Sequence, residues 1–377
     1  MPDSLTTELI ALRSHAERFA VDVLLPQRQA VDAQLQTNPD KMRQAVVAAA
    51  RAAGFFGMTQ PVAFGGTQAG PLALTVVRDT FAGYNTGFDR LVFGPGPGVL
   101  AACEEPLRSR YLTPLLDGRR RAGFAFTEPD DAEHFSRAVP TGDGHFRVDG
   151  RKSYVTRGGE ADFLNVLVDV PGEGRAMLVI DTDSPGVSIE RRFETLDGSH
   201  HAAFRFDDVR VPGDRIVGRP GEGLPRAMGQ IGDTRLAVAA RAVGLARWVV
   251  QHVHSHLGSV YRSGEPLAAR ESVRLRYAEM RIRTFAARSM VYRTARLAQS
   301  GAGVINECIA CKVFTTQTLT DVIDAAIELV GGKSLTVGHP LEELYRVARA
   351  LRTAEGAADV LRLSLAKGSL DLGQGVL

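Results

Sequence analysis

The spacing of apolar residues changes twice along the chain, and no other feature of the sequence limits the possible folds as strongly. Up to about residue 120 the apolar residues recur at helical spacing, as in DKMRQAVVAAARAAGFFGM, a helix that Gly54 is expected to end. From about 122 to 218 the spacing approaches two, which is typical of strands. From about 224 the helical spacing returns and holds to the end. The sequence therefore predicts helices, then a β domain, then more helices.

These boundaries predict three domains in a fold that is mainly α with a central β domain. We expect an N-terminal helical domain over residues 1–121, a middle β domain over 122–223 and a C-terminal helical bundle over 224–377. A chain of 377 residues is too long for one small core, so two or three packed units are expected. A β domain of roughly 100 residues has a usual domain size.

The β domain should contain a hairpin and several short strands. HFRVDGRKSYVT is a hairpin candidate, with Asp149 and Gly150 supplying the turn between its extended arms. FLNVLVDV and AMLVID are short apolar segments of strand length, and AAFRFDDVRVP alternates until Pro212.

Four long helical patterns follow, which are enough for a bundle. The third pattern should end at Gly331 and Gly332. The fourth is expected to be a single helix. The four patterns are RLAVAARAVGLARWVVQHV, VRLRYAEMRIRTFAARSMVYRTARLA, INECIACKVFTTQTLTDVIDAAIELVGG and EELYRVARALRTAEGAADVLRLSLAKG.

Composition and charge exclude several classes of function. Lys and Arg number 45 and Asp and Glu 43, a net charge of +2 that gives no attraction to nucleic acid or to an anionic membrane. No apolar run approaches the ~20 residues of a membrane span, and the first residues lack the pattern of a signal peptide. Three cysteines cannot form a disulfide framework. A cytoplasmic protein is expected.

Two clusters of metal-ligand residue types are better interpreted as structural. Cys308 and Cys311 lie in a strong helical pattern without a second ligand pair, so we expect small buried side chains and no metal. His252 and His256 lie one turn apart, and a surface histidine cluster is the favoured interpretation. His200 and His201 fall in an expected loop and receive no role. The sequence also lacks GxGxxG after a strand, a P-loop and GxSxG.

Several segments, in order along nearly the whole chain, resemble motifs of the acyl-CoA dehydrogenase family. Their order and spacing match those of the family, as does the helix–β–helix layout. The segments are GFFGMTQPVAFGG, AFTEP, VDGRKSYVTRGGEAD, FDDVRVPGDRIVGRPGEGL, TRLAVAARAVGLA, LVGGKS and YRVARALRTAEG.

The resemblance implies a fold, a cofactor and a reaction. The family fold is an α-helical domain, a small β domain and a C-terminal four-helix bundle. The family uses FAD to oxidise the Cα–Cβ bond of an acyl thioester, in lipid and fatty acid metabolism. A carboxylate takes the α-proton while the β-hydrogen leaves as hydride to flavin N5. The acyl carrier is CoA or an acyl carrier protein, and the electron acceptor is an electron-transfer flavoprotein. A homotetramer or homodimer is expected, with a heteromer as the alternative.

The resemblance also assigns the catalytic base. Taken alone, Glu355 is more typical of a charge at a helix end. It stands, however, where the commonest base of the family stands, in the EG pair of YRVARALRTAEG. A subset of the family has its base on an earlier helix, and that position here is Thr234, which cannot act as a base. The resemblance further implies that Arg235 and Gly356 bind substrate.

The cofactor residues implied by the resemblance fall into two groups. Thr127 and Thr156 match threonines that hydrogen-bond the flavin ring, and Tyr154 takes the place of a ring-stacking tryptophan, although ordinary strand packing would also account for these residues. The second group matches motifs on the diphosphate and adenine side of FAD. Its members are Arg262, Glu328, Gly331 and Gly332.

The chain departs from the family at positions that, by the resemblance, lie near the diphosphates of FAD or CoA. Glu133 takes the position of a serine that holds the substrate, with His134 in the position of an aspartate. Val260 replaces an arginine that reaches the neighbouring subunit's FAD, and Arg262 is the expected substitute. These departures leave two alternatives open beside the dehydrogenase. One is a flavin oxidase or monooxygenase on the same fold, and the other is a non-catalytic partner subunit of a heteromeric dehydrogenase.

Overall fold

The computed structural model describes residues 5–33, 38–260 and 264–371, and these belong to two units. The helical unit comprises Met1–Thr59, Thr67–Phe93 and Gly232–Leu377. The β unit comprises Gln60–Gly66 and Gly94–Ile231. The predicted fold class, mainly α with a central β domain, is confirmed. No helix in the described parts of the chain has both the length and the apolar composition of a membrane span.

The N-terminal part of the helical unit packs around aromatic side chains. Its helices are α1 (Thr7–Phe19), α2 (Leu25–Asp32), α3 (Pro39–Ala52) and α4 (Pro71–Ala82). The buried rings of Phe19, Phe55 and Phe81 contact one another, with centroids 5.1 to 5.8 Å apart. The predicted stop at Gly54 is confirmed: its φ is 80°, and Phe55 N–H donates to Ala50 O behind it, as in a glycine-ended helix.

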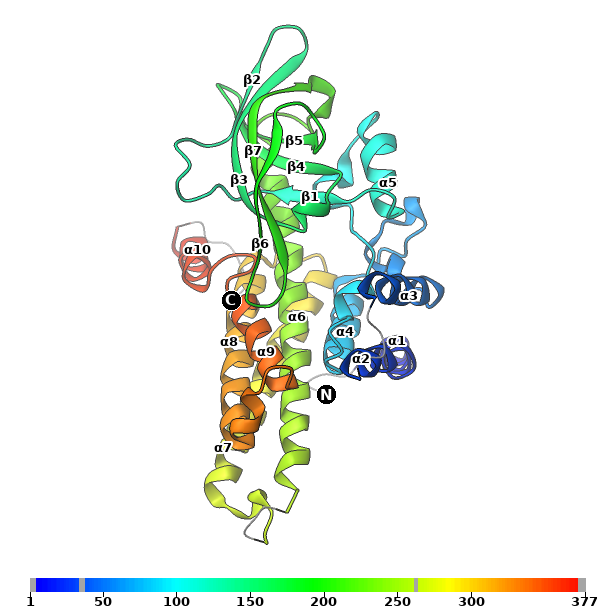
Figure 1. Ribbon diagram of the computed structural model, residues 1–377, viewed down its shortest axis with the longest axis vertical. Helices are drawn as coiled ribbons and strands as arrows, with labels where there is room; N and C mark the ends of the chain where they lie inside the picture. Colours follow the sequence, from blue (N-terminus) through cyan, green and yellow to red (C-terminus); the bar gives the residue numbers. More distant parts are fainter. Residues whose placement is uncertain (1–4, 34–37, 261–263, 372–377) are drawn as a thin grey trace. The chain divides into compact units, whose positions relative to one another are not determined.

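The C-terminal part of the helical unit is a bundle, as predicted (Figure 1). Its helices are α6 (Gly223–Leu257), α7 (Glu271–Gln299), α8 (Ile305–Val330), α9 (Pro340–Leu351) and α10 (Ala358–Leu370). The core between α6, α8 and α9 is apolar and is formed by residues such as Val249, Val253, Leu319, Ile323, Leu344 and Ala348.

The prediction of one continuous fourth helix is wrong, because α9 and α10 are separate helices. The break includes Glu355 and Gly356, whose φ values are 57° and 111°. An α-helix needs negative φ at every residue, so two successive residues with positive φ prevent α9 and α10 from forming one helix. The break is the structural feature that sets Glu355 apart from an ordinary helix-end charge.

The β unit is built on a seven-stranded sheet. Strands β1 (Ala122–Ala125) and β2 (Arg137–Pro140) pair in parallel with different parts of β4 (Phe163–Val170). Strand β5 (Gly174–Asp181) pairs antiparallel with β4, which is buried along nearly its whole length. Strands β3 (His145–Thr156), β7 (His200–Pro212) and β6 (Val187–Glu194) extend the sheet beyond β2. A short helix, α5 (Thr113–Leu116), precedes β1.

The predicted hairpin at Asp149 and Gly150 is also wrong, because both residues lie inside the continuous strand β3. Gly150 has a φ of 148° at a register shift between β3 and β7. A Cβ on Gly150 would lie 2.4 Å from Ser136 Oγ and 2.6 Å from Ser136 Cα. The glycine therefore serves a bulge and a close approach of two strands, whereas the hairpin turn lies between β2 and β3.

Candidate active site

Glu355 lies in the turn between α9 and α10 in a left-handed backbone conformation, with a φ of 57°. This conformation costs a residue with a side chain about 1 kcal/mol or more. Gly356 follows with a φ of 111°, and a Cβ there would lie 3.0 Å from Leu361 Cδ2. A glycine at this position is therefore needed for both conformation and space.

Two cations from other helices hold this turn through its backbone. Arg235 on α6 is buried, and its Nε donates to the carbonyl oxygen of Glu355 at 3.3 Å. Lys312 on α8 is fully buried, and its Nζ donates to the carbonyl oxygens of Arg352 at 2.9 Å and Gly356 at 2.7 Å. The turn that carries Glu355 is thus fixed by residues distant in the sequence.

The half-buried carboxyl of Glu355 has a perturbed acidity. Burial raises its pKa, while the positive charges of Arg235, Lys312 and Arg90 oppose that rise. A carboxylate with a raised pKa is a stronger base, which is the property that proton abstraction next to a carbonyl group needs. Such perturbed groups are typical of functional sites.

In the β unit, the ring-binding candidates Thr127, Tyr154 and Thr156 are all exposed. Tyr154 is 60% exposed and has a φ of 53° at a register shift of β3. Its ring meets the Phe193 ring edge-on, with centroids 5.2 Å apart. Ser153 N–H donates to Thr127 O at 2.8 Å, which joins the segment after β1 to β3. The three candidates therefore belong to neighbouring backbone segments.

A buried ion pair supports these segments, and sequence reasoning missed it. Lys152 is fully buried, and its Nζ lies 2.5 Å from Glu128 Oε1 and donates to Phe126 O at 3.2 Å. Glu128 also accepts hydrogen bonds from the backbone N–H and the hydroxyl of Ser136. Burial lowers the pKa of Lys152 to about 8, although Glu128 opposes this. The only available signal was the neighbourhood of each residue, Glu128 beside Thr127 and Lys152 near Tyr154.

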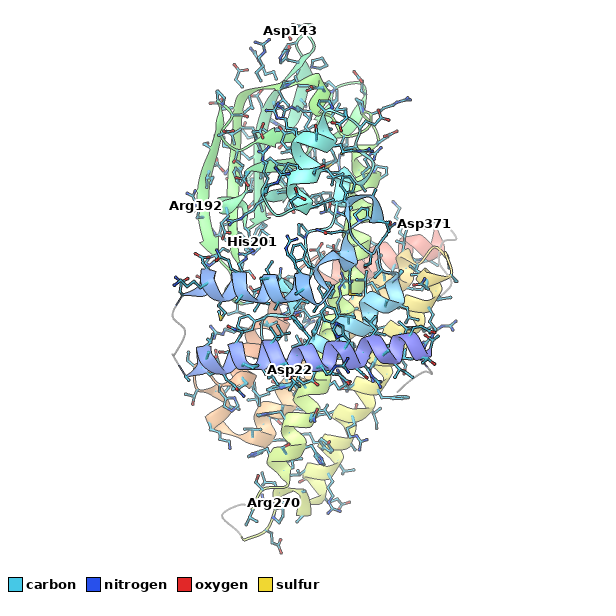
Figure 2. The ribbon with its side chains drawn as sticks, turned by 90° about the vertical axis from the view of Figure 1, so that its right-hand side faces the viewer. Asp22, Asp143, Arg192, His201, Arg270 and Asp371 are labelled. Carbon is cyan, nitrogen blue, oxygen red and sulfur yellow. The ribbon has the colours of Figure 1, made fainter. Side chains whose placement is uncertain are left out.

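His201 was expected in a loop, but it lies on β7, where His200 is the first residue. Its ring stacks on Phe193 with centroids 5.6 Å apart, and its Nδ1 is 3.5 Å from Thr156 Oγ1. Figure 2 labels His201 and Arg192, which lie at one end of the sheet, with Asp143 at the other. His201, which is half-buried, thus lies among the aromatic and hydroxyl side chains around Tyr154.

This group fits a flavin ring. An isoalloxazine needs an aromatic or apolar surface and hydrogen-bond donors at its edge, and an exposed tyrosine with two exposed threonines supplies both. Thr127 and Thr156 would hold the edge of the ring, and Tyr154 would lie against its face.

The remaining cofactor candidates lie elsewhere. Glu328 is exposed near the end of α8, and its carboxylate pairs with Arg276 of α7 at 2.5 Å. Gly331 follows α8 with a φ of 84°, and Gly332 begins a 3-10 turn. Arg262 lies outside the described residues. The substrate candidate Glu133 is exposed between β1 and β2.

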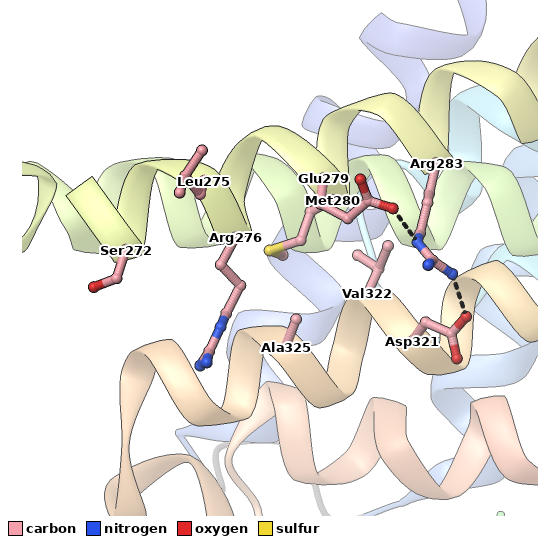
Figure 3. Close-up of a pocket in the computed structure, with 9 residues that line it drawn as sticks. All are labelled: Ser272, Leu275, Arg276, Glu279, Met280, Arg283, Asp321, Val322 and Ala325. Atoms are coloured by element: carbon pink, nitrogen blue, oxygen red, sulfur yellow. Dashed lines mark hydrogen bonds and ion pairs between the residues drawn. The ribbon is translucent and has the colours of Figure 1, made fainter. Parts of the chain in front are cut away.

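A groove of about 620 Å³ between α7 and α8 contains none of the predicted site residues (Figure 3). Arg276 lines it, and Arg283 crosses it to bind Glu279 on its own helix and Asp321 on α8. Arg276 instead pairs with Glu328, which does not line the groove, so the charged groups of the groove have ionic partners.

The two cysteines of the C-I-A-C segment, Cys308 and Cys311, are buried, as predicted. His252 is less exposed than a surface cluster implies, because its ring stacks on Trp248 at 4.8 Å. Among the described residues, no group of three or more His, Cys, Asp or Glu side chains is placed to hold a metal ion.

Three family models match the chain in succession. They are described as the N-terminal, middle and C-terminal domains of acyl-CoA dehydrogenase, and they match residues 6–119, 123–209 and 221–370. The chain therefore belongs to the acyl-CoA dehydrogenase family. The family consists of FAD-dependent oxidoreductases that act on CH–CH groups.

Individual relatives match over almost the whole length. A probable acyl-CoA dehydrogenase, FadE25 of Mycobacterium tuberculosis (strain ATCC 25618 / H37Rv), is 26% identical over 375 residues, which cover 95% of this chain and 94% of that protein. The crystal structure of a probable acyl-CoA dehydrogenase from Mycobacterium abscessus is 27% identical, with a TM-score of 0.84 over 96% of this chain and 98% of that chain. An acyl-CoA dehydrogenase from Bacillus anthracis complexed with FAD shares the fold at 22% identity, with a TM-score of 0.83 over 98% of this chain and 68% of that chain.

Proposed function

We propose that this protein catalyses the α,β-dehydrogenation of an acyl thioester, with Glu355 as the base that removes the α-proton. The observation that carries the proposal is the state of Glu355. It is a half-buried carboxylate with a raised pKa, held in a strained turn by cations from two other helices. Strain of this kind persists where the surrounding structure over-determines the backbone, as functional sites commonly do.

The chemistry asks little more of Glu355 than position and basicity. Its carboxylate oxygen accepts the α-proton of the thioester, and its raised pKa makes that transfer less uphill than it would be for an ordinary carboxylate. Arg235 and Lys312 fix the turn through backbone carbonyls, so the side chain itself stays available. The chemistry that bound FAD supplies is acceptance of the β-hydrogen as a hydride.

The remaining roles complete the proposal. Thr127, Tyr154 and Thr156 hold the flavin ring, and Glu128 with Lys152 keeps the segment of Thr127 in place. The less central cofactor candidates are Arg262, Glu328, Gly331 and Gly332, and the substrate candidates are Glu133, Arg235 and Gly356.

We further propose the molecular partners. The substrate is an acyl-CoA or an acyl group on a carrier protein, and an electron-transfer flavoprotein accepts the electrons. The protein is expected to act in the cytoplasm as a homotetramer or homodimer. A purified chain with the visible spectrum of a flavoprotein would support a complete cofactor site.

The test is anaerobic flavin reduction by a panel of acyl-CoAs, followed in the visible spectrum by stopped flow. We expect Glu355→Gln to keep the fold and the flavin and to reduce flavin at least ~100-fold more slowly, the scale of losing a general base. Asp359→Asn is the matched control, because Asp359 is an exposed carboxylate just beyond the same turn and its ion pair with Arg362 lies within α10.

Reduction at the wild-type rate in Glu355→Gln would refute the base assignment. Failure of every acyl thioester to reduce the wild-type flavin would refute the dehydrogenase. Rapid reoxidation by air in preference to a flavoprotein acceptor would instead favour an oxidase. A colourless chain that gains flavin only with a second protein would favour a partner subunit.

A further inference from the structure

Lys312 is a charged residue in a place where helices normally bury apolar side chains. It lies on α8 and is fully buried, close in sequence to the buried residues Cys308, Ile309 and Cys311. Burying an ammonium group without partners costs several kcal/mol, so such a lysine persists only where hydrogen bonds and charges compensate it. The contacts of Lys312 therefore indicate what it does.

The hydrogen bonds of Lys312 join the two ends of the turn that carries Glu355. One acceptor is the carbonyl oxygen of Arg352, just after α9, at 2.9 Å, and the other is that of Gly356, just before α10, at 2.7 Å. These acceptors lie on either side of Glu355 in the sequence. Lys312 on α8 thus holds the backbone on both sides of Glu355, the residue with the left-handed conformation.

The charge of Lys312 acts on the same residue. Its ammonium group and the Glu355 carboxylate attract each other, and each shifts the acidity of the other. Three more cations face this place, namely Arg235 from α6, Arg90 from the 3-10 turn Asp89–Leu91, and Arg352. Burial and the neighbouring arginines lower the pKa of Lys312 to about 8, so it is mainly protonated at pH 7.

We propose that Lys312 is the positioning residue of the candidate base, because it clamps the Glu355 turn and keeps a positive charge beside the Glu355 carboxylate. The inference rests on the proposed function of Glu355. The hydrogen bonds of Lys312 to the turn and the effect of its charge on Glu355 can both be measured without catalytic turnover. Lys312 touches neither substrate nor the reacting atoms in this role, since both of its hydrogen bonds go to backbone carbonyls.

The first test needs no activity. We compare wild type with Lys312→Met, a neutral substitution of similar length, and measure the Glu355 carboxyl by carbon NMR in glutamate-labelled protein. The Glu355 signal is identified by its absence from Glu355→Gln. Loss of the positive charge should move the titration midpoint of Glu355 to higher pH. Loss of the clamp should speed amide exchange in the turn between α9 and α10.

The second test uses the pH profile of anaerobic flavin reduction. The acid limb, which reports ionisation of the base, should move to higher pH in Lys312→Met, with about a 10-fold slower reduction at pH 7. Lys312→Arg keeps the charge and should keep the acid limb, even if packing slows the reaction. Lys367→Met, which removes an exposed lysine of α10, should change neither limb nor amide exchange.

The outcomes separate this inference from the function on which it rests. A folded Lys312→Met protein with an unchanged Glu355 titration would overturn the inference, and so would unchanged exchange in the turn. If Lys312→Met does not fold, a displaced acid limb in Lys312→Arg would overturn the charge role. If no acyl-CoA reduces the flavin of the wild-type protein, only the proposed function is refuted, because the NMR titration of the Glu355 carboxyl still tests Lys312.

Discussion

Replacing Lys152 with methionine should destabilise the β unit by about 3 kcal/mol, the lower end of the cost of removing one partner from a buried ion pair. The lysine is fully buried and pairs with Glu128 at 2.5 Å, so methionine would leave the Glu128 carboxylate with only its hydrogen bonds to Ser136. It would also remove the donor to Phe126 O. Replacing Glu128 by glutamine as well removes the uncompensated charge, so the double variant should recover most of the loss.

The pH dependence of unfolding gives a second signature of Lys152, which the Lys152→Met variant should lack because it has no titrating group at this position. Burial lowers the pKa of Lys152 from 10.5 to about 8, so the folded protein releases this proton before the unfolded chain does. Between pH 8 and 10.5 the unfolded chain holds more protons, so the contribution of Lys152 to the free energy of unfolding becomes more favourable as pH rises.

The assay is urea unfolding of wild type, both single variants and the double variant at several pH values, followed by far-UV circular dichroism. Trp248, the single tryptophan, lies in the helical unit, and its fluorescence reports that unit separately. Arg147→Met is the control, because it removes one partner of an exposed ion pair with Asp208 and should cost less than about 1 kcal/mol.

Two results would refute this reasoning. One is a loss below about 1 kcal/mol in Lys152→Met, which would mean that Glu128 finds water or another partner. The other is a double variant no more stable than Lys152→Met, since most of the loss should come from the uncompensated carboxylate of Glu128.

Two further predictions concern the residues of the candidate site. Gly356→Ala should lower the free energy of unfolding by about 1 to 3 kcal/mol, because the residue has a positive φ and the new Cβ would meet Leu361. Gly303→Ala is the control: a Cβ there meets nothing within 4 Å, so the same urea titration should show almost no change. Equal losses at both sites would contradict the prediction. Thr156→Val should change the flavin spectrum or its reduction rate because a donor near the ring is lost, so an unchanged spectrum and rate would argue against β3 as a flavin contact.

Local patterns in the sequence were sufficient where the physical cause is local. Helix periodicity, the stop at Gly54, the short apolar strands and the end of the last strand at Pro212 were predicted from neighbouring residues. These features depend on side-chain spacing and on the backbone freedom of single residues, which a sequence states directly. The resemblance to the acyl-CoA dehydrogenase family rested on the same short segments.

Local patterns gave wrong predictions where the same residues are compatible with two backbone conformations. Asp149 and Gly150 favour a tight turn, but β3 continues through them, because the glycine accommodates the backbone of Ser136. The last helical pattern continues through Glu355 in sequence, yet α9 ends at Leu351 and α10 begins only at Ala358. In both cases, contacts with another segment decided between two conformations that the local sequence permits.

The sequence by itself determined the order of the elements, the family and the identity of Glu355 as the candidate base. Only the tertiary structure decided what gives Glu355 its properties, because Lys312 is 44 residues from its partner Gly356, and Arg235 is 120 residues from Glu355. Burial and charge act through space, so a pKa depends on which distant residues the fold brings together. The same holds for Lys152 and Glu128, whose pairing requires that β3 pass beside the segment after β1.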